Sequence, residues 1–118
     1  MNDVNRRGRI ATLVLSGLLA LLYVAAGVPK VVGVESAVTG FENFGYPTWF
    51  RLLIGVIEIG GGIGLLMPRV AFYAAGALGV VMIGAAYTIT VHGEPGVAIP
   101  LVCLVLLAIV AYLRRPTA

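Results

Sequence analysis

The chain has 118 residues, of which 60% are hydrophobic and only 11% are charged. A soluble domain carries roughly 25% charged residues, so this chain cannot cover itself with polar surface, and its solvent is largely lipid. The chain has one cysteine and one histidine, which excludes an internal disulfide and a multi-histidine or cysteine-based metal site within one chain. Its net charge is +3, but it has no block of basic residues of the kind that binds nucleic acid.

Four apolar runs follow one another along the chain. They cover about residues 10–28, 49–67, 70–91 and 97–113. Spanning a bilayer takes about 20 apolar residues, with roughly 17–25 tolerated, and the backbone in lipid must satisfy its own hydrogen bonds. We therefore expect an all-α membrane protein, a four-transmembrane-helix bundle that forms one domain over residues 1–118.

The segment between the first two runs is more than a turn. Val34, Val38, Phe41 and Phe44 recur there at helical spacing, with polar residues between them. This pattern predicts a short amphipathic helix that lies on the membrane face or folds back as a lid. An ordered loop is the alternative.

The basic residues predict the orientation. Six of them fall on one side of the expected spans: Arg6, Arg7, Arg9, Arg69, Arg114 and Arg115. The other side holds only Lys30 and Arg51. Because cytoplasmic loops are enriched in Lys and Arg, we expect both termini in the cytoplasm. We expect an integral membrane protein, with a bacterial plasma membrane as its location.

The second run, "GVIEIGGGIGLL" (55–66), holds a carboxylate, Glu58. Ionisable residues inside a span are costly, and a functional site is the default hypothesis for them. Residues 51, 55, 58 and 62 share one helix face, so Gly55 and Gly62 flank the carboxylate. This bare face leaves room for another helix, a row of waters or a flat ligand. Glu58 is the candidate catalytic residue, and the alternative is a structural carboxylate paired with Lys30.

Depth in the membrane indicates which residues could join Glu58. Tyr23 in the first run lies at about the depth of Glu58, and Tyr87 and Thr88 in the third run lie one turn in from the outer surface. Lys30 follows the first run at that surface, and its long stem could bend down toward Glu58. The candidate ligand-binding residues are Glu58, Lys30, Tyr23, Tyr87, Gly55 and Gly62, and no metal site is expected. The tyrosines could instead be packing residues. Gly60 and Gly64 form a GxxxG pair, which predicts close helix packing and allows a homo-oligomer.

The motifs resemble those of the DoxX-like family of small four-helix membrane proteins. "AAGVPKVVG" (25–33) is similar to that family's G-x-x-K element, and "FENFGYP" (41–47) to its Phe-x-x-x-Gly-x-Pro lead into the second helix. "GVIEIGGGIGLLMPRVA" (55–71) resembles its E-x-x-G-G signature, and "GALGVVMIGAA" (76–86) fits its third helix. The resemblance implies a four-helix membrane bundle associated with redox systems, with a quinone as the possible cofactor.

Four interpretations of the function stay open. The first is a membrane subunit or accessory of a redox complex that binds a quinone or another lipophilic molecule near Glu58. The others are a ligand-free scaffold, a small transporter, and an intramembrane enzyme that uses Glu58 as acid or base on a lipophilic substrate. The bilayer is the expected partner in each, and nucleic acid is expected in none.

Overall fold

The computed structural model describes residues 3–115. This part of the chain folds into five helices, namely α1 (Asp3–Val32), α2 (Glu35–Asn43), α3 (Thr48–Leu65), α4 (Ala71–Val91) and α5 (Ala98–Leu113). Of the helices in this part, α1, α3 and α4 are long and apolar enough to cross a membrane. α5 is apolar but has only 16 residues. The predicted all-helical class is confirmed, with three long candidate spans and one shorter apolar helix.

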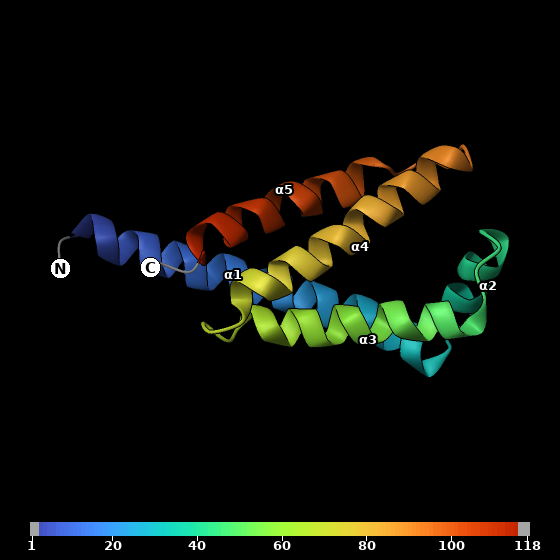
Figure 1. Ribbon diagram of the computed structural model, residues 1–118, viewed down its shortest axis with the longest axis horizontal. Helices are drawn as coiled ribbons and strands as arrows, with labels where there is room; N and C mark the ends of the chain where they lie inside the picture. Colours follow the sequence, from blue (N-terminus) through green and yellow to red (C-terminus); the bar gives the residue numbers. More distant parts are fainter. Residues whose placement is uncertain (1–2, 116–118) are drawn as a thin grey trace.

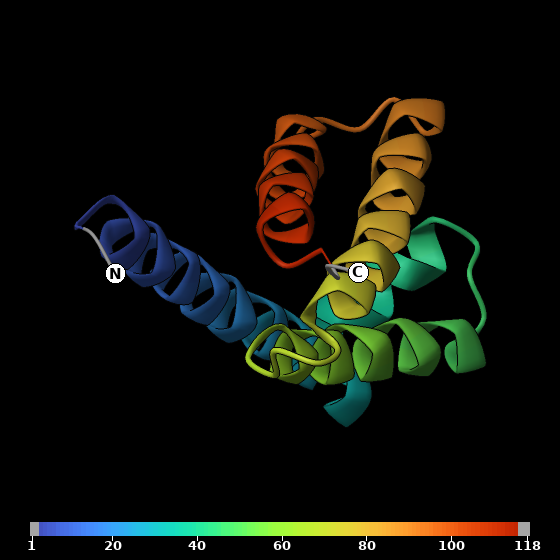
Figure 2. The same ribbon diagram turned by 60° about the vertical axis from the view of Figure 1, so that its left-hand side comes forward.

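The helices run along the long axis of a body that measures 52 × 26 × 24 Å (Figure 1). α1 packs mainly against α3, and α4 packs mainly against α5. The two pairs meet mainly through α3 and α4, with a smaller contact between α1 and α5. Figure 2 shows the pairs diverging away from these contacts. α2 lies at the end of the body opposite the last turn of α5. The fold therefore leaves a gap between the helix pairs at the α2 end.

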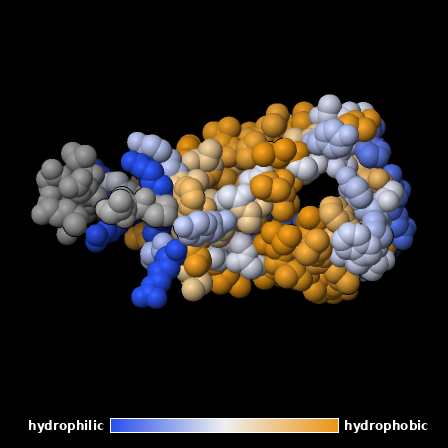
Figure 3. Space-filling model, viewed as in Figure 1, coloured by the Kyte–Doolittle hydropathy of each residue, from blue (hydrophilic) through white to orange (hydrophobic). Residues whose placement is uncertain are grey.

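The surface has the pattern of a membrane protein. Figure 3 shows a broad apolar belt between two more polar ends. Large hydrophobic side chains such as Leu18, Ile83 and Ile99 are exposed on it. The buried core is small and is built around Leu65, Leu78 and other residues that several helices share. Hydrocarbon is the solvent that such a surface needs.

α1 extends further than the sequence predicts. We expected it to stop near residue 28, because a proline removes a backbone N–H and usually ends a helix. Instead Pro29 sits within the last turn, and the helix ends at Val32, just before Gly33, where φ is +88°. The N–H groups of Gly33 and Val34 both donate to the Pro29 carbonyl, at 3.0 and 3.1 Å. Lys30 is thus held on a helix rather than in a loop.

α2 is the amphipathic helix expected between the first two spans. It is followed by a turn at Gly45, where φ is +80°, and then by α3. Phe41, Tyr46 and Phe50 form an aromatic cluster here, in which the Tyr46 and Phe50 ring centroids are 4.7 Å apart. This cluster covers the gap between the helix pairs at the α2 end.

Candidate functional site

Three glycines let α1 and α3 approach closely. A Cβ added at Gly27 would lie 2.7 Å from the Gly55 carbonyl oxygen, and one added at Gly55 would lie 2.8 Å from Val31 Cγ2. A Cβ at Gly62 would lie 3.0 Å from the Ala20 carbonyl oxygen. α1 therefore occupies the bare face of α3 on which Gly55 and Gly62 lie. Small residues at such contacts are typical of membrane helices.

This contact brings Lys30 to Glu58. Lys30 Nζ lies 2.5 Å from Glu58 Oε1, and it also donates to the Ala26 carbonyl at 3.3 Å. The Glu58 side chain is only 3% exposed, whereas that of Lys30 is 22% exposed. A carboxylate buried this deeply needs a partner, and the lysine supplies one.

Arg51 strengthens the junction above the ion pair. Its guanidinium donates to the backbone carbonyl of Lys30 and packs over Gly33. Arg51 therefore ties the last turn of α1 to the first turns of α3. Since Lys30 belongs to that last turn of α1, the contact also fixes the position of the ammonium group.

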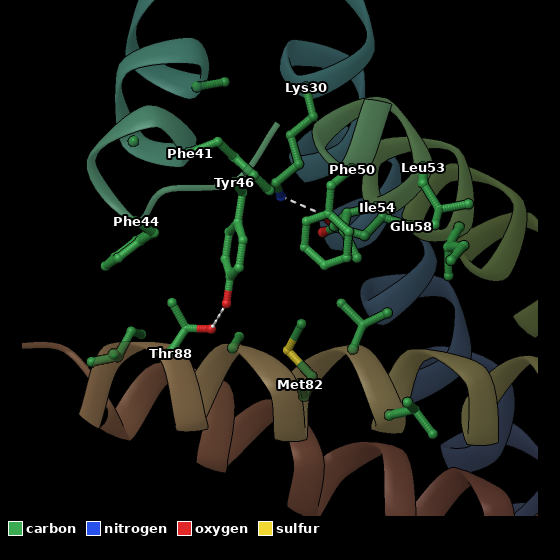
Figure 4. A pocket seen from close by; sticks show the side chains of 18 of the residues that line it. Lys30, Phe41, Phe44, Tyr46, Phe50, Leu53, Ile54, Glu58, Met82 and Thr88 are labelled. Atoms are coloured by element: carbon green, nitrogen blue, oxygen red, sulfur yellow. Dashed lines mark hydrogen bonds and ion pairs between the residues drawn. The ribbon is translucent and has the colours of Figure 1, made fainter. Parts of the chain in front are cut away.

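A cavity of about 640 Å³ lies beside the ion pair, between α2, α3 and α4 (Figure 4). Lys30 and Glu58 form part of its wall. Most of the other lining side chains are aliphatic or aromatic: Ala37, Phe41, Phe44, Tyr46, Phe50, Leu53, Ile54, Ile57, Val80, Val81, Met82, Ala85 and Ile89. Small-molecule pockets commonly measure about 300–1,000 Å³ and combine apolar walls with a few convergent polar groups, as this cavity does.

A second polar contact lies across the cavity from the ion pair. The Tyr46 hydroxyl is 2.5 Å from Thr88 Oγ1, which joins the segment after α2 to α4 (Figure 4). Beside it the ring of Phe44 meets that of His92 edge to face, at 4.9 Å between centroids. His92 Nδ1 is 2.8 Å from the Thr88 carbonyl oxygen. Side chains thus bridge the seam between the α2 segment and α4.

The sequence model of the DoxX-like family matches residues 14–110, a range that contains the ion pair and every residue of the cavity wall. The chain belongs to the DoxX-like family. A Bacillus subtilis (strain 168) protein, "Uncharacterized protein YdgD", is 34% identical over 71 residues, which amount to 58% of this chain and 62% of that protein. No solved structure matches the chain significantly. The DoxX-like membership inferred from the motifs is confirmed.

Not every residue that we predicted for the site of this DoxX-like protein lies at the cavity. Glu58 and Lys30 do. Tyr23 is buried among core residues, and its hydroxyl has no hydrogen-bond partner among residues 3–115. Tyr87 is 69% exposed and is absent from the cavity wall, as are Gly55 and Gly62, which contact α1.

The glycine pairing expected in α3 is also different in this DoxX-like fold. Gly64 packs against α4, where an added Cβ would lie 2.9 Å from Ala74 Cβ. Gly60 faces open space and makes no close contact within the chain, so the expected Gly60/Gly64 face does not pack there through Gly60. Gly61 takes its place, because a Cβ there would lie 2.8 Å from the Leu78 side chain.

Tyr46 and Thr88 are polar residues of the cavity wall that were not among the candidate ligand-binding residues predicted from the sequence. Aromatic residues gather at the membrane interface, so the sequence explains Tyr46 without a ligand. Thr88 follows Tyr87 directly, but it is buried and faces the cavity. The sequence did offer one signal for Thr88, because a polar side chain in an otherwise apolar helix needs a polar partner. That argument applies to a threonine more strongly than to Tyr87, whose ring is largely apolar.

Proposed function

We propose that this DoxX-like protein binds a lipophilic small molecule with a polar head in the cavity between α2, α3 and α4. The observation that carries the proposal is the pairing of a largely apolar cavity of about 640 Å³ with two polar contacts on its wall. A buried ion pair with a purely structural role would need no space beside it. The cavity favours a ligand-binding role over a ligand-free scaffold.

The hydrogen-bonding capacity of the wall indicates the kind of head group. An ammonium group has three donors, and Lys30 uses two of them on Glu58 and Ala26. One N–H is left for an acceptor on the ligand. The Tyr46 and Thr88 hydroxyls share one hydrogen bond and keep further donor and acceptor capacity.

A quinone has the features that this wall would recognise. It has a flat ring with two carbonyl acceptors, and the rings of Phe41, Tyr46 and Phe50 offer aromatic faces for stacking. The redox association implied by the DoxX-like resemblance supports the same class. We therefore take a quinone as the first probe, within the broader class of lipophilic molecules with a polar head.

The proposal includes a membrane arrangement with four spans and both termini in the cytoplasm. Sixteen residues make α5 about 24 Å long, which is short for a hydrocarbon core of about 30 Å. α5 nevertheless packs along α4, a full-length candidate span. Arg69, Arg114 and Arg115 lie on the end from which α1 starts, which supports this orientation.

A fluorescence titration tests the proposal. Trp49 is the single tryptophan of the chain, and its ring centroid is 5.8 Å from that of Phe50, a cavity residue. In lipid nanodiscs, a benzoquinone with an alkyl tail should quench Trp49 saturably. Glu58→Gln should weaken that binding, whereas Glu94→Gln, in the exposed loop after α4, should not.

The contradictory result is equally clear. Quinone dissolved in the bilayer also quenches tryptophan, but it does so without saturation. If wild type, Glu58→Gln and Glu94→Gln all gave the same unsaturable quenching, the cavity would not bind this class of ligand.

A further inference from the structure

Part of the cavity wall is also part of the outer surface. Leu53 on α3 is 45% exposed and Val80 on α4 is 69% exposed, yet both line the cavity. Gly84, one turn further along α4, lines the cavity and is exposed as well. Residues that face both the cavity and the surroundings mark its mouth.

This mouth lies within the apolar belt. Val80 is near the middle of α4 (Ala71–Val91), and Leu53 belongs to the apolar helix α3. Figure 3 is viewed across the long axis of the body, and it shows a hollow between the apolar surfaces of α3 and α4. Since the helices run along that long axis, an opening in this direction faces hydrocarbon rather than water.

We infer that the cavity opens sideways into the bilayer between α3 and α4, and that its ligand is a neutral amphiphile that enters from the lipid. The polar head would contact Lys30 and the Tyr46–Thr88 pair inside, while an apolar tail passes between Leu53 and Val80 into the membrane. The head is neutral because Lys30 and Glu58 already balance each other's charge. This inference rests on the proposed function and adds the route of entry and the need for a tail.

Gly84 keeps the mouth open. A Cβ added there would meet no atom within 4 Å, so a larger side chain would stand in the cavity without displacing the backbone. Gly76 provides a matched control, because it lies on the same helix, is equally free of neighbours and is absent from the cavity wall. Because Gly84 has no side chain, a ligand with a tail can pass the mouth, and this residue therefore determines which ligands the cavity accepts.

Photolabelling of the full chain in lipid nanodiscs tests this route. The probe is a benzoquinone with an alkyl tail that carries a diazirine close to the ring, and the labelled residues are mapped by mass spectrometry. Saturable labelling is expected at Leu53 and Val80. Gly84→Leu should reduce it by about tenfold or more, because the leucine side chain would narrow the mouth through which the ring enters. Gly76→Leu should leave it unchanged.

Each other outcome overturns a defined part of the account. Saturable labelling confined to the α2 side, at Ser36 and its neighbours, would overturn the lateral route and leave the proposed function standing. An equal loss of saturable labelling in Gly84→Leu and Gly76→Leu would also overturn the lateral route and leave the proposed function standing. No saturable labelling of the wild type would overturn the proposed function and this inference with it. If Gly84→Leu does not fold, Val80→Trp narrows the same mouth from its exposed rim and carries the same expectation.

Discussion

Loss of either partner of the Lys30–Glu58 ion pair should have unequal effects on stability. Lys30→Met leaves a carboxylate that is 3% exposed without a partner, and it should lower the unfolding free energy by about 3–5 kcal/mol. Glu58→Gln leaves an amide oxygen as acceptor for an ammonium group that is 22% exposed. Because a lysine stem can carry its charge toward water, this change should cost only about 1–2 kcal/mol. The double variant retains neither charge and should recover much of the larger loss.

Unfolding in mixed micelles measures these differences. The helical signal in circular dichroism is followed while the fraction of denaturing detergent is raised, for the two single variants and the double variant. Glu94→Gln, at an exposed loop position, is the control and should match the wild type. A Glu58→Gln protein that loses more stability than Lys30→Met, or a double variant without recovery, would refute the reasoning.

Three further predictions concern packing, the seam and the orientation. Gly27→Ala should lower the unfolding free energy by about 1–3 kcal/mol, because its Cβ would meet the backbone of α3. Gly60→Ala should not lower it, since Gly60 faces open space. Equal melting temperatures of the two variants would contradict the close α1–α3 contact. Tyr46→Phe removes the hydrogen bond to Thr88, so it should lower the unfolding free energy by about 1 kcal/mol and weaken quinone binding. Tyr87→Phe should do neither. An equal effect of Tyr87→Phe would contradict the role of the Tyr46–Thr88 contact between the α2 segment and α4. A cysteine at Glu94 should react with an impermeant reagent in intact cells, and reaction only after permeabilisation would reverse the proposed orientation.

Most of the fold was predictable because lipid restricts the choices. Apolar runs near the length of a bilayer must be helices, and the bounds of α3, α4 and α5 lie within two residues of the expected ones. α1 was harder, because a proline normally ends a helix. Pro29 removes one backbone hydrogen bond, but it lies in the final turn, so only a few helical residues follow it.

The site was predictable only in part, since sequence gives depth but not rotation. Glu58 and Lys30 were evident because charges inside a span are rare. One residue turns a helix by about 100°, so depth could not decide between Tyr87 and Thr88 on a helix that is apolar all round. The glycines showed where side chains are missing, but only the structure identifies α1 as the element that fills the space beside Gly55.

The most direct measurement of the central claim is the lipophile content of the purified protein. The wild type and Glu58→Gln are isolated in mild detergent, and their organic extracts are quantified by mass spectrometry against protein amount. The account predicts one lipophilic molecule with a polar head per wild-type chain, and a clear depletion of that molecule in Glu58→Gln although this variant remains folded. Extracts of the two proteins that contain the same compounds, none of them in proportion to the protein, would contradict it.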